Sequence, residues 1–205
     1  MCILIPKIAH RSDLQAIHTV GCVNWPEKFP YAPDVRFGTG HTGSEILLRF
    51  ELREQATMGL VTTDNGAVWE DSCVEFFISF DETGYYNFEF NAIGTKLLGF
   101  RKERNRFTHA PTEVMRSILT FPSLGNTAFK LQEGDIRWSL EAVVPATALF
   151  RHEIADLTGM TACANFYKCG DRLPTPHFLS WMPIDNPTPD FHLERFFGKV
   201  IFGKS

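Results

Sequence analysis

Residues 73–91 have the sequence CVEFFISFDETGYYNFEFN, and this stretch decides the fold class. Large apolar residues occupy alternate positions on both sides of a central Asp-Glu-Thr-Gly segment, and a period of two is typical of a β-strand with one buried face. The central residues favour a tight turn between the two runs. The predicted buried face of this hairpin comprises Val74, Phe76, Ile78, Phe80, Phe88 and Phe90.

The same period extends outward from this hairpin. Residues 44–53 alternate in the same way, and the Asn65-Gly66 step favours a turn with positive φ. Further strands are predicted at residues 58–63, 96–101, 117–121, 128–131, 136–144, 161–168, 177–181 and 198–202. Helix is expected only at 12–18, which begins with an N-cap serine, and at 146–150, which follows a proline. The prediction is an all-β protein, a single-domain antiparallel β-sandwich (residues 1–205) with one or two short helices.

Composition limits the classes of partner. The chain has 205 residues, 44% of them hydrophobic, which is enough for a closed core. Its 20 Lys and Arg against 24 Asp and Glu give a net charge of −4, so no nucleic-acid partner is expected. The longest apolar run, residues 1–5, is too short for a membrane span, and no membrane partner is expected. Because no basic leader precedes an apolar stretch, the chain as numbered is predicted to be cytoplasmic, or secreted or periplasmic if a leader was removed.

The cysteines and histidines give no local metal motif. The five cysteines, at positions 2, 22, 73, 163 and 169, include no CxxC pair, and their apolar neighbours favour reduced, structural residues. No two of the seven histidines are three or four residues apart. The sequence leaves the metal content open.

Polar residues alternate with the apolar face of the hairpin. Glu75, Phe77 and Ser79 share one side with three residues of the second run, Asn87, Glu89 and Asn91. One interpretation is the solvated outer face of a sandwich. The other is a polar platform for a sugar or another polyhydroxyl ligand, because carboxylates and carboxamides suit neutral hydroxyls.

Two tryptophans lie at strand ends near this face. Trp69 precedes the hairpin and Trp181 is followed by Met-Pro, so the two indoles could clamp one sugar ring between them or could each plug an end of the core. Trp25 and Trp138 are interpreted as core or edge residues. The basic run at 101–106 is interpreted as a solvated hairpin end.

A family resemblance rests on residues 68–95, VWEDSCVEFFISFDETGYYNFEFNAIGT. This segment resembles the central signature of the family 9 carbohydrate-binding modules, in which a Trp and acidic residues lead into a VE-hydrophobic strand, a YYNFE strand and a GT turn. Residues 165–181 occupy the place of the family's second aromatic, and residues 189–202 are similar to its closing segment. The resemblance covers roughly residues 30–202.

The resemblance implies a β-sandwich that binds mono- or oligosaccharides, including chain ends, between two tryptophans. It places Trp69 at the first clamp, Glu75 at the carboxylate that accepts bonds from hydroxyls, Trp181 at the second clamp and Lys96 near a basic contact. Asn87, Glu89 and Asn91 complete the predicted ligand-binding set. No cofactor is predicted, although family members with structural calcium exist. Such modules accompany xylanases and other glycoside hydrolases, so the expected partners are a saccharide and a hydrolase of polysaccharide breakdown.

Other functions stay open. Glu75 and Glu89 could form an acid/base pair for glycoside cleavage, which needs roughly 5–10 Å between carboxyls, but a flat outer face offers little burial to raise a pKa. A haem-binding sandwich would use residues among Met58, Met160, Met182, His109 and His177. A degenerate interaction domain that has lost its sugar site is a further hypothesis. HExxH and GxSxG motifs are absent from the sequence, so the metalloprotease and hydrolase-elbow interpretations lack their minimal parts. Whether the chain is an enzyme stays open, with a non-catalytic binder preferred.

Overall fold

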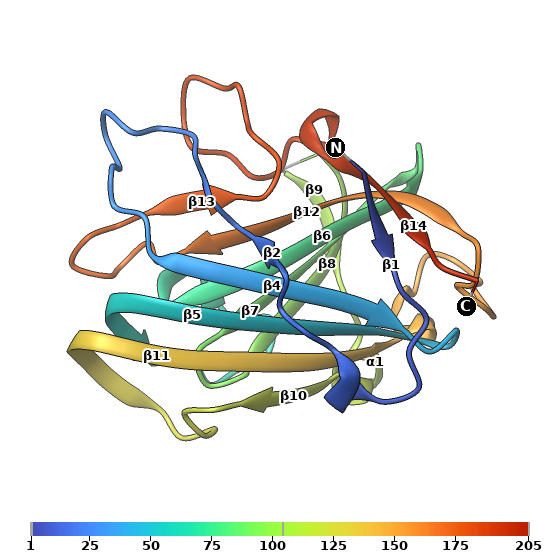
Figure 1. Cartoon of the computed structure of the whole chain (residues 1–205), viewed down its shortest axis with the longest axis horizontal. Coiled ribbons are helices and arrows are strands. Elements are labelled where there is room, and N and C mark those ends of the chain that lie inside the picture. The colour runs from blue at the N-terminus through green and yellow to red at the C-terminus, as the bar shows by residue number, and fades with distance from the viewer. Residues whose placement is uncertain (1, 104, 205) are drawn as a thin grey trace.

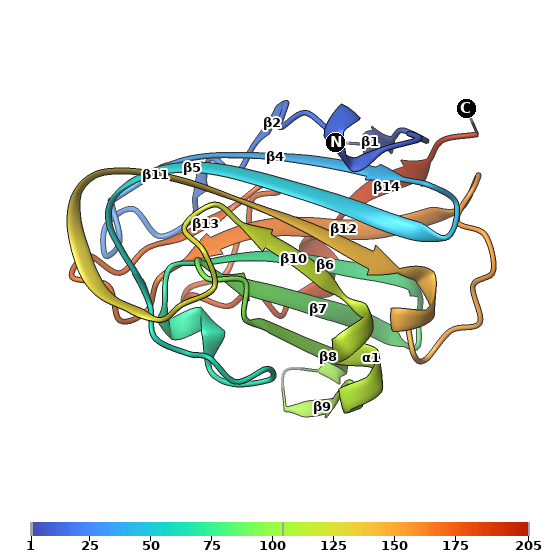
Figure 2. The same cartoon turned by 90° about the horizontal axis from the view of Figure 1, so that it is seen from below.

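Two facing β-sheets make up the structure, a computed structural model that describes residues 2–103 and 105–204 (Figure 1). The larger sheet has the strand order β1 (Cys2–Ile5), β14 (Gly198–Phe202), β12 (Thr161–Cys169), β6 (Cys73–Asp81), β7 (Gly84–Asn91), β8 (Lys96–Glu103), β9 (Arg106–His109). Alongside it, β12 also pairs with β13 (Phe178–Ser180), which pairs with β3 (Cys22–Val23). The second sheet has the order β10 (Leu119–Pro122), β11 (Phe129–Pro145), β5 (Glu45–Gly59), β4 (Asp34–His41), β2 (His18–Thr19). Figure 2 shows β4, β5 and β11 as one layer above β6, β7 and β8.

The pairing is antiparallel between neighbouring strands of both sheets in the described chain, except at one edge. There β1 runs parallel to β14, with Cys2 opposite Lys199 and Ile5 opposite Phe202. The amide of Gly203 extends this edge by donating to the carbonyl of Ile5 at 2.8 Å. The predicted all-β sandwich is confirmed.

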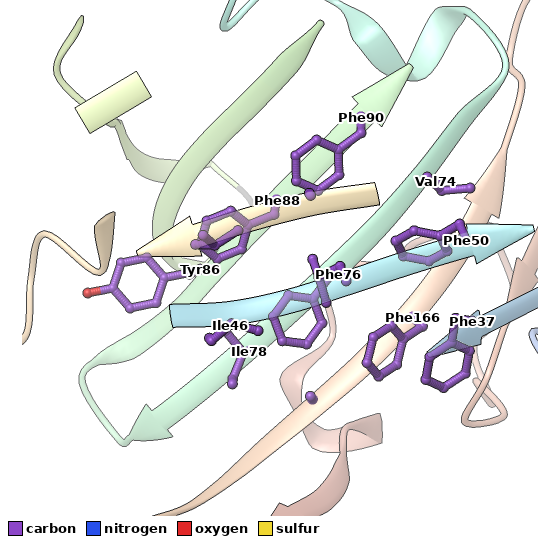
Figure 3. Close-up of a cluster of buried hydrophobic side chains, with 14 of the residues drawn as sticks. Phe37, Ile46, Phe50, Val74, Phe76, Ile78, Tyr86, Phe88, Phe90 and Phe166 are labelled. Atoms are coloured by element: carbon purple, nitrogen blue, oxygen red, sulfur yellow. The ribbon is translucent and has the colours of Figure 1, made fainter. Parts of the chain in front are cut away.

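The core lies between the sheets and is built from the apolar face predicted for residues 73–91. Figure 3 shows these side chains pointing toward apolar residues of the second sheet. Phe166 of β12 connects the two sheets, since its ring stacks on Phe37 of β4 with centroids 3.8 Å apart and on Phe76 with centroids 4.9 Å apart. Each buried side chain of this size contributes about 1.5–3 kcal/mol to stability. The hairpin is therefore stabilised by the packing of its inner face against the second sheet.

One buried ion pair joins the sheets through the core. Lys168 of β12 and Glu54 of β5 are both fully buried at their side chains, with Nζ 3.0 Å from Oε2. The other Glu54 oxygen accepts bonds from the Trp138 indole at 2.6 Å and the Ser72 hydroxyl at 2.5 Å. Lys168 Nζ also lies 2.9 Å from His177 Nε2, at the end of the loop that leads into β13. This network fixes the loop after β12 relative to the second sheet.

Helical segments in the described chain are short. They are the 3₁₀ turns η1 (Arg11–Asp13), η2 (Val68–Glu70), η3 (Ala146–Ala148) and η4 (Glu194–Phe196) and the helix α1 (Thr112–Ser117). The helix expected at 12–18 is wrong, because the chain leaves the η1 turn and forms β2 at His18–Thr19. The segment expected at 146–150 forms only the η3 turn. No helix within residues 2–103 and 105–204 has the length and apolarity needed to cross a bilayer.

The strand β4 was not predicted, and its glycines explain why. Gly38 and Gly40 interrupt the apolar pattern of Asp34–His41. A Cβ at Gly38 would lie 2.1 Å from the backbone oxygen of Gln15, so a side chain there would collide with the segment that crosses β4. Glycine therefore permits a close backbone approach here, and the strand's usual sequence signal is lost.

Candidate functional site

The second face of the larger sheet is covered rather than solvated. Glu75 lies directly opposite Glu89 across β6 and β7, and Tyr167 lies opposite Glu75 on β12. A second apolar cluster packs on this face. Phe77 and Tyr85 of the sheet contribute to it, and Trp25, Ile184 and Phe191 come from segments near the two ends of the chain. The interpretation of this face as a solvated surface is wrong, because these segments remove its polar residues from water. Trp25 and Trp138 are buried, as expected of core residues.

An opening in this cover forms a pocket of about 470 Å³. Its floor carries Glu75, Glu89 and Arg101 from the outer face of β6, β7 and β8. Aromatic side chains line its walls, among them Trp69, Phe107, Phe178 and Phe191. The volume falls within the range of about 300–1,000 Å³ that is typical of small-molecule sites.

The two floor carboxyl groups are buried opposite one another. Both residues are 3% exposed. Burial raises the pKa of Glu89 to about 7, although the hydrogen bond from Asn87 and the charge of Arg101 oppose the shift. Burial also raises the pKa of Glu75 well above its usual range, and the neighbouring Cys169 and Glu89 add to this effect. Protonated carboxyls can donate as well as accept hydrogen bonds, so this pair can serve both sides of a hydroxyl group.

One oxygen of the Glu89 carboxyl group accepts a hydrogen bond, and the other does not within the described chain. Its Oε1 accepts a bond from Asn87 Nδ2 at 2.9 Å, whereas its buried Oε2 has no hydrogen-bond partner among the described residues. The Arg101 Nε–H donates to Asn87 Oδ1 at 2.9 Å, so Asn87 connects the acid and the base of the floor. The expectation of a solvated basic run at 101–106 is wrong for Arg101, which is buried. Arg104 lies outside the described residues.

Trp69 reaches the pocket from the η2 turn and is 37% exposed. The turn is tied to the loop after β12, since the amide of Asp171 donates to the Trp69 carbonyl at 3.2 Å and that of Arg172 to the Glu70 carbonyl at 3.1 Å. Buried Asp71 fixes the other side of the turn by accepting the amides of two residues that follow β5, both at 2.9 Å. The indole is therefore held at the pocket on a short, braced segment.

The comparisons with known proteins agree with this architecture. The family model for carbohydrate-binding family 9 matches residues 5–202. The chain belongs to carbohydrate-binding family 9. This membership confirms the resemblance seen in residues 68–95. Among curated proteins, no sequence matches the chain.

Several solved structures are also similar to this chain. A Bacteroides uniformis protein with a provisional carbohydrate-binding assignment is 36% identical, with a TM-score of 0.92 over 98% of each chain. A family 9 module from Caldicellulosiruptor kristjanssonii in complex with glucose is 12% identical, with a TM-score of 0.61, 100% of this chain and 97% of that chain being covered. The module from the same organism in complex with cellotriose is 11% identical, with a TM-score of 0.59. The match covers 100% of this chain and 95% of that chain. At these low identities the two modules show a shared fold alone.

Trp181 does not lie where the family 9 resemblance places a second clamp. Its side chain is 6% exposed and packs in the core between the sheets, with its ring 5.9 Å from that of Phe166 and 6.1 Å from that of Phe37. The expected pairing of its indole with Trp69 is corrected by the structure. Phe178 of β13, three residues before Trp181, is the aromatic residue of this segment that lines the pocket.

Asn91 and Lys96 also lie away from the pocket lining. Asn91 uses Nδ2 to donate to Asp71 at 2.8 Å, and its Oδ1 accepts the amides of two residues in the following turn. Lys96 pairs with Asp64, with 3.2 Å between Nζ and Oδ2. Both residues brace loops. Asn87 is fully buried beneath the floor and acts through Glu89 and Arg101.

Several pocket residues were not predicted. Phe178 and Phe191 come from irregular or short segments with no period to follow. Arg101 was detectable, since it shares the alternation of β8 with Leu97, which lies opposite Glu89. Of the haem candidates, His177 contacts Thr175 and Lys168 through its two ring nitrogens. One group of potential metal ligands occurs among the described residues: Cys73, Glu75 and Cys169.

Proposed function

We propose that this chain is a non-catalytic carbohydrate-binding module that holds a mono- or oligosaccharide in the pocket beside Trp69. The observation that supports this function is the exposed indole of Trp69 at a pocket whose floor presents Glu75 and Glu89. Family 9 membership gives this pocket a chemical context. The fold is shared with modules whose structures contain glucose or cellotriose.

Binding would combine stacking with hydrogen bonds to hydroxyls. The apolar face of a pyranose ring would lie on Trp69, while its hydroxyls turn toward Glu75, Glu89 and the Arg101 guanidinium. The available Glu89 oxygen would then gain the donor it lacks. Since the larger sheet closes the floor, a sugar enters from one side, and this favours the end of a glycan chain. We expect modest affinity, because ordering costs offset most of the gain.

Isothermal titration calorimetry tests this function. Glucose, cellotriose and xylotriose are titrated into the wild-type protein and into Trp69→Ala, with expected loss of detectable binding in the variant and an unchanged melting temperature. Phe121→Ala is the matched control, because Phe121 is also an exposed aromatic residue but lies on β10 of the second sheet. Equal sugar affinity in wild type and Trp69→Ala would contradict the proposed site.

The biological setting follows from the same proposal. A module without its own catalytic residues would deliver or retain sugars for a glycoside hydrolase of polysaccharide breakdown, with xylan among its candidate substrates. Co-purification with such a hydrolase, lost when free sugar is added, would support the association.

Glycoside hydrolysis is a second candidate function, and the Glu75–Glu89 pair favours it. The outer face is covered instead of flat and solvated, and burial raises the pKa of both carboxyl groups. Directly opposed residues have Cβ atoms about 4.5–5.5 Å apart, and retaining hydrolases use carboxyls about 5–5.5 Å apart. Release of nitrophenol from aryl glycosides, lost in Glu75→Gln, would establish the enzyme, whereas no turnover with intact sugar binding would exclude it.

A further inference from the structure

Two cysteines and a carboxyl group meet beside the pocket. Cys73 of β6 and Cys169 of β12 are direct cross-strand partners, and Glu75 follows two residues after Cys73 on the same face. The two Sγ atoms and a carboxyl oxygen of Glu75 all lie within 4.8 Å of one another. Cys169 and Glu75 line the pocket, so the cluster borders a space that solutes can enter.

The spacing of these three atoms suits a tetrahedral metal ion. Zinc–sulfur bonds of about 2.3 Å and zinc–oxygen bonds of about 2.0–2.2 Å place tetrahedral ligand atoms roughly 3.5–3.8 Å apart. The three atoms, which lie within 4.8 Å of one another, are close to this spacing. Cys169 Sγ already lies 3.1 Å from Glu75 Oε1. Both strands belong to one continuous ladder, so the ligands are held on rigid elements.

The neighbouring lysine does not occupy the ligand atoms of the cluster. The nearby Lys168 ammonium is directed to Glu54 on the core side of β12. A metal ion would supply the positive charge that stabilises the thiolates, and its binding would release the thiol protons to solvent.

We propose that Cys73, Glu75 and Cys169 form a binding site for Zn²⁺, with water or a ligand hydroxyl completing the coordination from the pocket side. Two thiolates select a borderline-soft ion and disfavour calcium, which takes oxygen ligands. The site is therefore chemically different from the structural calcium found in some members of the family. It does not rest on the proposed sugar binding, although Glu75 serves in both.

Cobalt substitution tests this site directly. Protein is reduced, freed of reductant under nitrogen, and checked for five titratable thiols after denaturation. Co²⁺ is then titrated into the folded protein. We expect one equivalent to produce a near-ultraviolet thiolate-to-cobalt charge-transfer band and the visible bands of tetrahedral cobalt, and one equivalent of Zn²⁺ to bleach both. Absence of the charge-transfer band in this reduced wild-type protein would overturn the proposal.

Variants assign the ligands. Cys73→Ser and Cys169→Ser should each strongly reduce the charge-transfer band, and Glu75→Gln should weaken Zn²⁺ binding at least about tenfold in competition with a chromophoric chelator. Cys163→Ser is the matched control, because Cys163 lies on the same strand as Cys169 but is exposed and outside the cluster. A band that survives unchanged in both Cys73→Ser and Cys169→Ser would place the metal elsewhere and contradict the proposal. Sugar calorimetry on metal-free protein keeps this result separate from the proposed function.

Discussion

Asn87 fixes the relative positions of the acid and the base at the pocket floor. Its amide donates to Glu89 and accepts from Arg101, both at 2.9 Å, and its side chain is fully buried. Because both ends of the amide are used, neither neighbour can shift without breaking a buried hydrogen bond. Asn87 is therefore a positioning residue that supports the site without lining it.

Gly99 provides the space that Asn87 needs. A Cβ at this position would lie 2.7 Å from Asn87 Oδ1. We predict that Gly99→Ala destabilises the fold by about 1–3 kcal/mol and lowers sugar affinity several-fold, because Asn87 has no room to yield. Urea unfolding and calorimetry measure the two effects. Gly21→Ala is the control, since its new Cβ would meet only the exposed Thr19 side chain at 3.2 Å; equal effects in both variants would contradict the prediction.

His177 makes stability depend on pH in a defined direction. Burial, and then the charge of Lys168, lowers the pKa of His177 to about 3. The unfolded chain has a histidine pKa of about 6.5, so between about pH 6.5 and 3 the unfolded state binds the extra proton and the free energy of unfolding falls as the pH falls. Lys168 and the phenol ring of Tyr31 contact this group, and Lys168 is paired in turn with Glu54.

His177 is expected to change the free energy of unfolding by at most about 1.4 kcal/mol per pH unit. Urea unfolding at pH 7, 6, 5 and 4 measures it. In His177→Gln, whose amide oxygen can accept from Lys168, the pH dependence over this window should become shallower. An identical pH profile in the wild type and the variant would show that His177 is not the group responsible.

Among the elements, β12 serves two environments by alternation. Lys168 faces the core and pairs with Glu54 of β5, whereas the next residue, Cys169, faces the pocket. The same strand therefore carries both the connection between the sheets and one wall of the candidate site. A change on its core face should be transmitted to the pocket through the backbone of residues 168–169.

We predict that Lys168→Met destabilises the protein by about 3–5 kcal/mol, because Glu54 would be left as an uncompensated buried charge. The double variant Glu54→Leu/Lys168→Met should recover part of this loss, although Trp138 and Ser72 would still lack their acceptor. Arg53→Ala, which breaks an exposed pair with Asp135, should leave urea unfolding almost unchanged. A Lys168→Met protein as stable as the wild type would contradict the importance of the buried pair.

For the whole molecule, the two tryptophans expected to act together should separate in their effects. Trp181→Ala should cost about 3–5 kcal/mol of stability, because it leaves a cavity between the sheets. At a temperature where it remains folded, it should keep sugar binding. Trp69→Ala should abolish sugar binding and leave the stability almost unchanged. Paired melting curves and calorimetry check this, and strong loss of sugar binding by folded Trp181→Ala would restore the two-tryptophan clamp.

The sequence predicts the fold better than it predicts the site. The alternation in residues 73–91 identifies both faces of the hairpin correctly, and it places Glu75 and Glu89 side by side. It does not show what covers the outer face, because the covering segments around Trp25 and Phe191 have no period. Trp181 was misplaced since its position relative to Phe178 depends on where the short β13 begins.

The parallel ladder between β1 and β14 has a consequence for biosynthesis. Cys2–Ile5 is synthesised almost two hundred residues before its partner Gly198–Phe202. Until then the outer backbone groups of this edge remain unpaired and open to other chains. Chaperone protection during translation should therefore matter most in the interval before β14 emerges.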